Sequence, residues 1–285
     1  MFVCSSHDYV MFFTNMGRVY RLKCFEVPEG SRTAKGLNIV NLLPLQPEEK
    51  VSAMIRVEDY TEGQYLTMIT RHGIIKRTRL DAYSNVRKNG LIAIDLDEGD
   101  ELVCVQTTDG NQQLLVATAD GMAIRFDEND ARVIGRTARG VKALNLAADD
   151  TVVGMELVDN EKLLLTVTET GYGRLSRFDE YRVQSRGGKG LTNYRTEKYG
   201  DVVGIMTVSP EEEDLILISS GGIIIRMHIA EIRLCSRTSK GVRVMRMEGD
   251  TSIVSIAGAE HDAAEVNASV DTSEPVEEDE PADEE

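Results

Sequence analysis

Gly135-Arg136-Thr137-Ala138-Arg139-Gly140 is the stretch that decides the fold, because four similar loops occur elsewhere in the chain. Each of the five loops is rich in Arg or Lys and closes on a glycine, and successive closing glycines are 54, 50, 50 and 51 residues apart. The other four loops are residues 31–36, 85–90, 185–190 and 236–241. A fixed period of this size is typical of folds built from stacked or radially arranged repeats.

Each repeat predicts four strands in the same order. An apolar run, such as residues 114–119, leads through a glycine to a second run in which apolar and basic residues alternate, such as residues 122–126. The basic loop, a third run, an acidic turn and a fourth run follow. Alternation at period two places successive side chains on opposite faces of a strand. Five such units predict an all-β, propeller-like ring of four-stranded blades over residues 1–258, in preference to a sandwich or a pair of barrels.

The formal net charge of −16 is concentrated at one end of the chain. Residues 260–285 contain twelve Asp or Glu and no Lys or Arg, so the rest of the chain has 36 acidic against 32 basic residues, a net charge of −4. Residues 259–285 also lack periodic apolar positions, and we expect them to form a disordered acidic tail. Such a tail either competes with a polyanion for the basic loops or serves only to keep the protein soluble, and both alternatives stay open.

No catalytic, cofactor or metal site is predicted. The four cysteines and four histidines fall outside CxxC and metal-ligand spacings, so structural or incidental roles are expected for all eight. Gly188-Lys189 does not belong to a phosphate-binding P-loop, because Val183 stands where that motif has its first glycine and Gly190 where it has Ser or Thr. No Ser-His-Asp or Cys-His arrangement can be nominated from the sequence.

No part of the sequence predicts a membrane contact. No apolar run approaches the roughly 18–20 residues that a membrane span needs, and the N-terminal residues lack the pattern of a signal peptide. We therefore expect a soluble, cytoplasmic protein with no membrane partner.

The charges are segregated within each repeat, with cations on the second run and the basic loop and anions at the turn before the fourth run. If the blades pack radially in one orientation, the basic segments lie on one rim, as expected for a protein that binds DNA through its backbone. Gly187, Gly188 and Gly190 are expected to let the main chain approach a phosphate and to offer free N–H donors. A propeller that binds acidic proteins is the alternative. The candidate DNA-binding residues are Arg18, Arg21, Lys23, Arg32, Lys35, Lys76, Arg77, Arg79, Arg87, Lys88, Arg125, Arg136, Arg139, Arg174, Arg177, Arg186, Lys189, Arg226, Arg237 and Lys240.

The stretch Gln184-Ser185-Arg186-Gly187-Gly188-Lys189-Gly190 resembles the seven-residue box of the C-terminal domain of the DNA gyrase A subunit, which runs Gln, basic, Arg, Gly, Gly, basic, Gly. Gly17-Arg18-Val19-Tyr20 and residues 36–45 are similar to the early repeat of that family, and the acidic tail is a further similarity. The likeness covers nearly the whole chain. Ser185 departs from the box, and the match lies in the fourth loop, whereas the family's box belongs to the first blade. We therefore expect the true box upstream of Met1 and no special importance for residues 184–190.

The resemblance implies a six-bladed β-pinwheel whose blades exchange strands and whose basic perimeter wraps duplex DNA to support ATP-dependent negative supercoiling. It also implies that this chain is not catalytic by itself, because the family's cleavage tyrosine lies in the N-terminal region of the A subunit, while its ATPase lies in the B subunit. The implied partners are duplex DNA, the B subunit, and the rest of the A subunit, in an A2B2 holoenzyme that uses ATP and Mg²⁺. The C-terminal domain of the topoisomerase IV A subunit is the alternative within the family.

Overall fold

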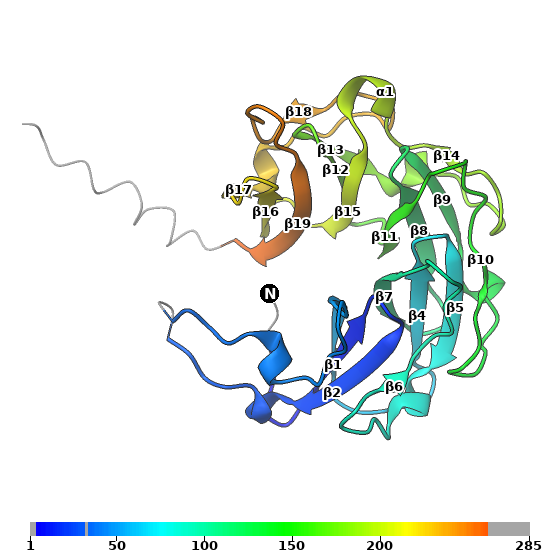
Figure 1. Ribbon diagram of the computed structural model, residues 1–285. Coiled ribbons are helices and arrows are strands. Elements are labelled where there is room, and N and C mark those ends of the chain that lie inside the picture. Colours follow the sequence, from blue (N-terminus) through cyan, green and yellow to red (C-terminus); the bar gives the residue numbers. More distant parts are fainter. Residues whose placement is uncertain (1–3, 32–33, 262–285) are drawn as a thin grey trace, which may run out of the picture.

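The computed structural model describes residues 4–31 and 34–261, which form a ring of five antiparallel sheets, the blades (Figure 1). Blade 1 contains β1 (Tyr9–Thr14), β2 (Arg18–Lys23), β3 (Val51–Val57) and β6 (Leu91–Ile92). Blade 2 contains β4 (Tyr65–Thr70), β5 (Ile74–Arg79), β7 (Leu102–Thr108) and β10 (Val141–Lys142). Blade 3 contains β8 (Gln113–Thr118), β9 (Met122–Asp127), β11 (Val152–Leu157) and β14 (Leu191–Thr192). Blade 4 contains β12 (Leu163–Thr168), β13 (Tyr172–Arg177), β15 (Val202–Val208) and β18 (Val242–Arg243), and blade 5 contains β16 (Glu213–Ser219), β17 (Ile224–His228) and β19 (Ile253–Glu260).

Helices are few and short in the described part of the chain. Single turns of 3-10 helix follow the second strands at Cys24–Glu26, Leu80–Tyr83, Glu128–Asp130, Phe178–Glu180 and Ile229–Glu231. A further 3-10 turn is Ile39–Asn41, and the four-residue α1 is Thr196–Tyr199. None of these helices is long and apolar enough to cross a membrane.

The third run of each repeat pairs with the blade before it. The strand β6, from the second repeat, pairs with β2 of the first repeat in the register Arg18↔Ile92 and Val19↔Leu91. Strands β10, β14 and β18 pair with the preceding repeat in the same way. The ring of blades is confirmed, but the blades do not coincide with the sequence repeats, because neighbouring blades exchange strands.

Blade 5 and the first repeat depart from the four-strand prediction. Blade 5 has three strands among the described residues. The third run of the first repeat, residues 37–43, contains the 3-10 turn Ile39–Asn41 instead of a strand. Both departures have one cause. A third run pairs only with the second strand of the preceding repeat, and among the described residues no strand precedes β1 and none follows β19.

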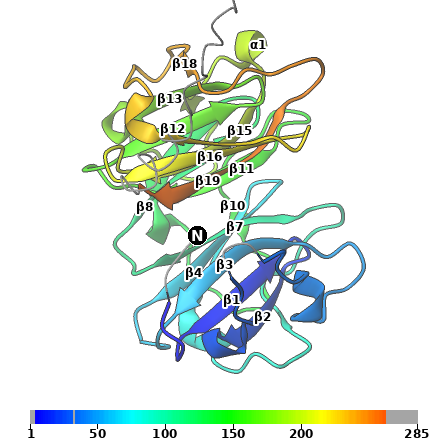
Figure 2. The ribbon, with the colours of Figure 1, turned by 90° about the vertical axis from the view of Figure 1, so that its left-hand side faces the viewer.

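The apolar core lies between adjacent blades. Phe13 of blade 1 packs with Leu66 and Met68 of blade 2, and all three side chains are fully buried. Comparable clusters join the later blades. At the centre of the ring, β3, β7, β11, β15 and β19 lie side by side in that order (Figures 1 and 2). This packing turns the outermost strands and their basic loops toward the perimeter.

The last strand extends slightly beyond the predicted domain boundary. We expected the ring to end at residue 258, but β19 continues to Glu260, which pairs with Glu213 of β16. Residues 262–285 lie outside the described residues, so the disordered tail stays a prediction.

Candidate nucleic-acid interface

Four of the five basic loops, residues 85–90, 135–140, 185–190 and 236–241, lie on the perimeter of the ring, each directly before an outermost strand (Figure 1). The closing glycines of the last three loops are required by close packing against main-chain atoms. Gly190 and Gly241 have φ of +79° and +75°, and a Cβ on them would lie 2.4 Å from the Ala123 carbonyl oxygen and 2.2 Å from that of Gly173. Only glycine adopts this conformation without strain and leaves room for the neighbouring strand. Each of these two loops is thereby held against the second strand of the preceding blade.

The first arginine of each of the last three loops forms a hydrogen bond with a neighbouring part of the rim. Arg136 donates a hydrogen bond to the Ile92 carbonyl oxygen at 2.8 Å. Arg186 bonds the Lys142 carbonyl at 3.1 Å, and Arg237 bonds the equivalent carbonyl of Thr192. These arginines are half-buried, so part of their hydrogen-bonding capacity serves the protein itself.

In four of the five loops the last cation stands directly before the closing glycine and is exposed. This set comprises Lys35, Arg139, Lys189 and Lys240, and Arg87 and Lys88 are exposed in the second loop. Arg139 forms an ion pair with Asp97 of the preceding acidic turn, and the Lys240 ammonium lies 4.7 Å from the centre of the Tyr172 ring. Cations at repeated positions along one rim suit a nucleic acid, because its phosphates also recur at regular intervals.

Four predicted DNA-binding cations are buried, and their assignment to the DNA surface was wrong. Lys76, Arg77, Arg125 and Arg174 are 1%, 5%, 8% and 0% exposed. All four lie on second strands, which have a strand on each side and a neighbouring blade above them. Alternation of basic and apolar residues cannot distinguish a solvent-facing cation from one that faces the next blade.

Lys76 and Arg174 hold the basic loops in place. The Lys76 ammonium bonds the carbonyl oxygens of Ala93, at 2.8 Å, and of Arg136. Arg174 bonds the carbonyl of Asn193 at 3.0 Å, that of Ser239 at 3.1 Å and that of Arg237. Burial, with a smaller contribution from the charge of Arg136, lowers the pKa of Lys76 to about 7. Their target carbonyls lie in loops 135–140 and 236–241 and just after the outermost strands, so these two buried cations support the rim from inside.

Arg77 and Arg125 connect a second strand to the 3-10 turn of the following repeat. Arg77 forms a buried ion pair with Glu128 at 2.9 Å and also bonds Asn129. Arg125 bonds the Phe178 carbonyl at 2.7 Å. Their role in this structure is therefore to join blades.

The remaining candidates divide between partnered and exposed groups. Arg18, Arg21 and Lys23 are half-buried and bond the carbonyls of Asn89, Ser84 and His7. Arg79 pairs with Asp81, Arg226 pairs with Asp214, and Arg177 is exposed. Arg32 lies outside the described residues.

The loop 184–190 is docked on the protein more firmly than the sequence suggested. The Gly187 N–H donates to the Ala143 carbonyl oxygen at 2.6 Å, and the Gly188 carbonyl accepts from the Asn145 N–H at 2.9 Å. The expectation that Gly187 offers a free donor to a phosphate was therefore wrong. In this loop Lys189 is the exposed charge.

Three exposed arginines were missed by the sequence reasoning. Arg132, Arg182 and Arg233 each stand four residues before the first arginine of a loop, and all three are exposed. Their constant offset in three repeats was the signal that could have found them. Lys142 and Arg243 on the outermost strands are also exposed.

Two groups of reactive side chains come together despite their spacing in the sequence. The Sγ atoms of Cys4 and Cys24 lie 2.8 Å apart, and burial raises the pKa of Cys24 to about 11. Asp214, His228 and His261 also meet, at the end of blade 5.

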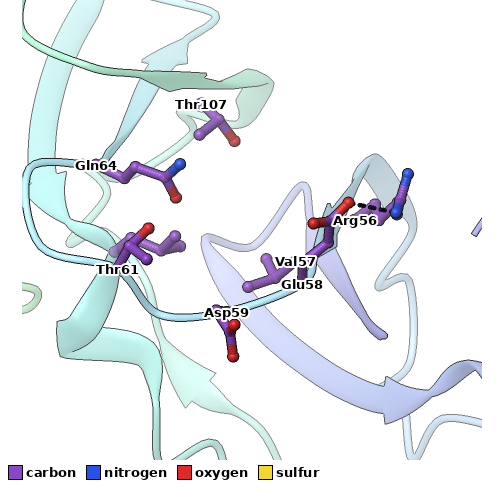
Figure 3. A pocket seen from close by; sticks show the side chains of 8 residues that line it. Arg56, Val57, Glu58, Asp59, Thr61, Gln64 and Thr107 are labelled. Carbon is purple, nitrogen blue, oxygen red and sulfur yellow. Dashed lines mark hydrogen bonds and ion pairs between the residues drawn. The ribbon is translucent and has the colours of Figure 1, made fainter. Parts of the chain in front are cut away.

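A hollow of about 520 Å³ lies beside the connection from β3 to β4 (Figure 3). Glu58 and Asp59 contribute carboxylates to it, and Arg56 is ion-paired with Glu58. Its lining residues include neither His nor Cys. This set of side chains does not suggest a catalytic site or an anion site.

The comparisons with known proteins agree with the geometry of the rim. All five repeats match the family model "DNA gyrase C-terminal domain, beta-propeller", over residues 8–58, 64–109, 112–159, 162–209 and 213–257. The DNA gyrase A subunit of Staphylococcus epidermidis is 46% identical over 255 residues, which cover 88% of this chain and 28% of that protein. The chain thus spans less than a third of the curated relatives that it matches.

Two solved structures have the same architecture at 26% sequence identity. The crystal structure of the C-terminal domain of DNA topoisomerase IV gives a TM-score of 0.82, with 93% of this chain and 83% of that chain covered. The structure of the DNA gyrase A C-terminal domain gives 0.75, with 89% and 83% covered.

Proposed function

The chain belongs to the DNA gyrase A C-terminal domain family, and on this premise we propose that it binds duplex DNA and bends it around the outer rim of the ring. One observation carries the proposal. An exposed cation stands at the same place, directly before the closing glycine, in loops 31–36, 135–140, 185–190 and 236–241. The exposed arginines Arg132, Arg182 and Arg233 add charge near the last three of these loops.

The rim acts on the DNA backbone in this proposal. Bending a 20–30 bp stretch of duplex by 40–90° costs roughly 1–6 kcal/mol, and repeated phosphate contacts offset this cost because each one releases counterions. The interactions of Lys76, Arg136 and Arg174 with rim carbonyls hold the loops in place before DNA arrives, which reduces the ordering that binding requires. Backbone contacts of this kind carry no sequence information, so binding is sequence-tolerant.

In the whole protein the chain supplies DNA wrapping and no reacting group. It works in the cytoplasm within a gyrase A subunit that pairs with a B subunit, and the wrapped DNA supports ATP-dependent negative supercoiling. Gyrase is preferred to topoisomerase IV because the relative at 46% identity is a gyrase A subunit, although the topoisomerase IV domain superposes with the higher TM-score.

Binding of a fluorescent linear duplex, measured by anisotropy at several salt concentrations, tests the proposal. We expect log affinity to fall linearly with log salt, with a slope of about −0.9 for each phosphate neutralised. A flat dependence, or no binding at low salt, would contradict DNA binding and favour the protein-binding alternative.

Reconstitution of the full A subunit with its B subunit separates the two enzymes, since gyrase introduces negative supercoils and topoisomerase IV mainly unlinks DNA circles.

A further inference from the structure

Three metal-binding side chains meet where the last described strand ends. Asp214 lies near the start of β16, His228 is the last residue of β17, and His261 directly follows β19. One donor atom from each residue lies within 4.8 Å of the other two. The two histidines are 14 and 47 residues from Asp214 in the sequence, so no ligand motif reveals them.

The geometry converges on one carboxylate oxygen. Asp214 Oδ1 lies 3.1 Å from His228 Nδ1 and 2.7 Å from His261 Nδ1. The two imidazole rings are stacked, with centroids 3.8 Å apart and an interplanar angle of 29°. His228 Nδ1 is also 3.2 Å from the Glu213 carbonyl oxygen, which is a second acceptor for it.

The carboxylate is fixed and charged. Asp214 is 3% exposed, and its Oδ2 accepts a hydrogen bond from Arg226 Nε at 2.7 Å, which leaves Oδ1 to the two imidazoles. The imidazoles are accessible, since the side chains of His228 and His261 are 24% and 22% exposed.

We propose that Asp214 Oδ1, His228 Nδ1 and His261 Nδ1 bind one Zn²⁺ ion, with water in the fourth position. Two imidazoles and a carboxylate are a donor set that zinc accepts in tetrahedral sites, with bonds of about 2.0–2.2 Å and hence about 3.3–3.5 Å between ligand atoms. The two oxygen–nitrogen separations are shorter than this by less than an ångström, and the accessible rings can rotate outward. A neutral imidazole that donates from Nδ1 becomes a ligand when its proton moves to Nε2, so the site exchanges hydrogen bonds for metal bonds. The positive charge of Arg226 repels a bound cation, but the Arg226 side chain is half-exposed and bonds Oδ2 of Asp214 instead of Oδ1.

The ion would fasten the ends of all three strands of blade 5. Blade 5 has no outer fourth strand in the part of the chain that the structure describes, and its last strand is followed by the acidic stretch of the sequence. Zinc would therefore fix the position at which that stretch leaves the ring. This inference is independent of the DNA-binding proposal, because none of its steps uses the rim loops.

Titration of the full chain with Zn²⁺ against a chromophoric zinc indicator tests the site. We expect one Zn²⁺ per chain, and a melting temperature that rises with Zn²⁺ and falls again with a chelator. In a double variant His228→Asn/His261→Asn both effects should disappear, with an affinity loss beyond the 10–100-fold that removal of an outer-shell partner costs.

A matched control uses the other two histidines. His7 and His72 are exposed, and the His72 imidazole lies 3.7 Å from the Asp100 carboxylate without a second histidine. A double variant His7→Asn/His72→Asn should bind one Zn²⁺ as tightly as the parent. Truncation after His261 removes the acidic stretch and should also leave binding intact. The proposal would be overturned if the parent did not bind Zn²⁺ stoichiometrically, or if binding survived in the His228/His261 variant. If the double variant does not fold, a single His261→Ala variant replaces it.

Discussion

At the scale of single residues, the unexpected finding is that four cations stabilise the fold instead of contacting solvent. Lys76, Arg77, Arg125 and Arg174 are buried, and the first and last of these bind carbonyl oxygens of the rim. A buried cation is tolerated when its donors are matched by acceptors, whereas an unmatched buried carbonyl costs about 1–3 kcal/mol. Replacing these residues is therefore expected to lower the stability of the fold more than it changes the charge presented on the surface.

Replacing Arg174 with Met should destabilise the protein strongly. The substitution leaves the carbonyls of Asn193, Arg237 and Ser239 without their buried donor, and we expect a loss of about 3 kcal/mol or more in the free energy of unfolding. Urea denaturation measures this quantity. The matched control is Arg177→Met, on the same strand but exposed, which should change stability by less than about 0.5 kcal/mol. Equal effects of the two substitutions would contradict the assigned role of Arg174.

Lys76 should make stability depend on pH above neutrality. Its pKa of about 7 in the folded protein lies below its value of 10.5 when unperturbed, so between these pH values the unfolded chain binds more protons and stability rises with pH. The expected slope in the middle of this window is about 1.4 kcal/mol for each pH unit, relative to a Lys76→Met variant. Below about pH 7 the difference between the two proteins should be constant. Unfolding curves at pH 6 to 10 test this, and a difference that does not vary with pH would exclude a neutral buried lysine.

At the scale of elements, the basic loop has two parts with different tasks. Its first arginine, in the last three repeats, bonds the rim of the preceding blade, and its closing glycine docks on the second strand. The cation that stands directly before the closing glycine faces solvent. The acidic turns are also structural, since the buried Asp100 accepts hydrogen bonds from the main-chain N–H groups of His72 and Glu101. Each of the last three loops thus presents one exposed charge at a position that its other residues determine.

Neutralising the exposed cation of one loop should weaken DNA binding without affecting the fold. For Lys189→Gln we expect the salt slope of log affinity to fall in magnitude by about 1 and the melting temperature to stay unchanged. Lys50→Gln is the control, because it removes the same charge from an exposed position next to an acidic turn. If Lys50→Gln reduced the slope as much as Lys189→Gln, net charge rather than the rim would explain binding.

Adding a methyl group to the closing glycine should distort its loop. In Gly190→Ala the Cβ would lie 2.4 Å from the Ala123 carbonyl oxygen, while in Gly187→Ala it would meet no atom within 4 Å, although both glycines have φ near +80°. Both variants bear the strain of a positive φ, about 1–2 kcal/mol, and Gly190→Ala should lose clearly more. Thermal unfolding of the two variants should give this order, and the reverse order would argue against the docked loop.

At the scale of the whole molecule, strand exchange converts a repeated sequence into one continuous rim. Each outermost strand carries its basic loop onto the preceding blade, so adjacent loops are linked through protein hydrogen bonds such as Arg136 to Ile92. A rim built in this way distributes the phosphate contacts. We therefore expect paired neutralisations, Arg136 with Arg139 or Arg186 with Lys189, each to weaken binding only in part.

Removal of the acidic stretch should strengthen DNA binding at low salt if the stretch competes for the rim. The truncation belongs after His261, because β19 continues to Glu260 and a cut at residue 258 would remove paired residues of the last strand. Anisotropy with and without residues 262–285 measures the effect. Unchanged affinity at low salt would favour a purely solubilising role.

The sequence by itself determined the repeat, the ring and the identity of the rim loops, because the period of the glycines and the alternation of side chains are local properties that backbone geometry imposes. Tertiary structure alone decided which cations meet solvent. Arg174 and Arg177 stand three residues apart on one strand, yet one is fully buried and the other exposed, because both faces of the strand are covered as far as Ser176 and Arg177 is its last residue. The exchange of strands and the meeting of Asp214, His228 and His261 likewise depend on packing between segments far apart in the chain, which no spacing in the sequence records.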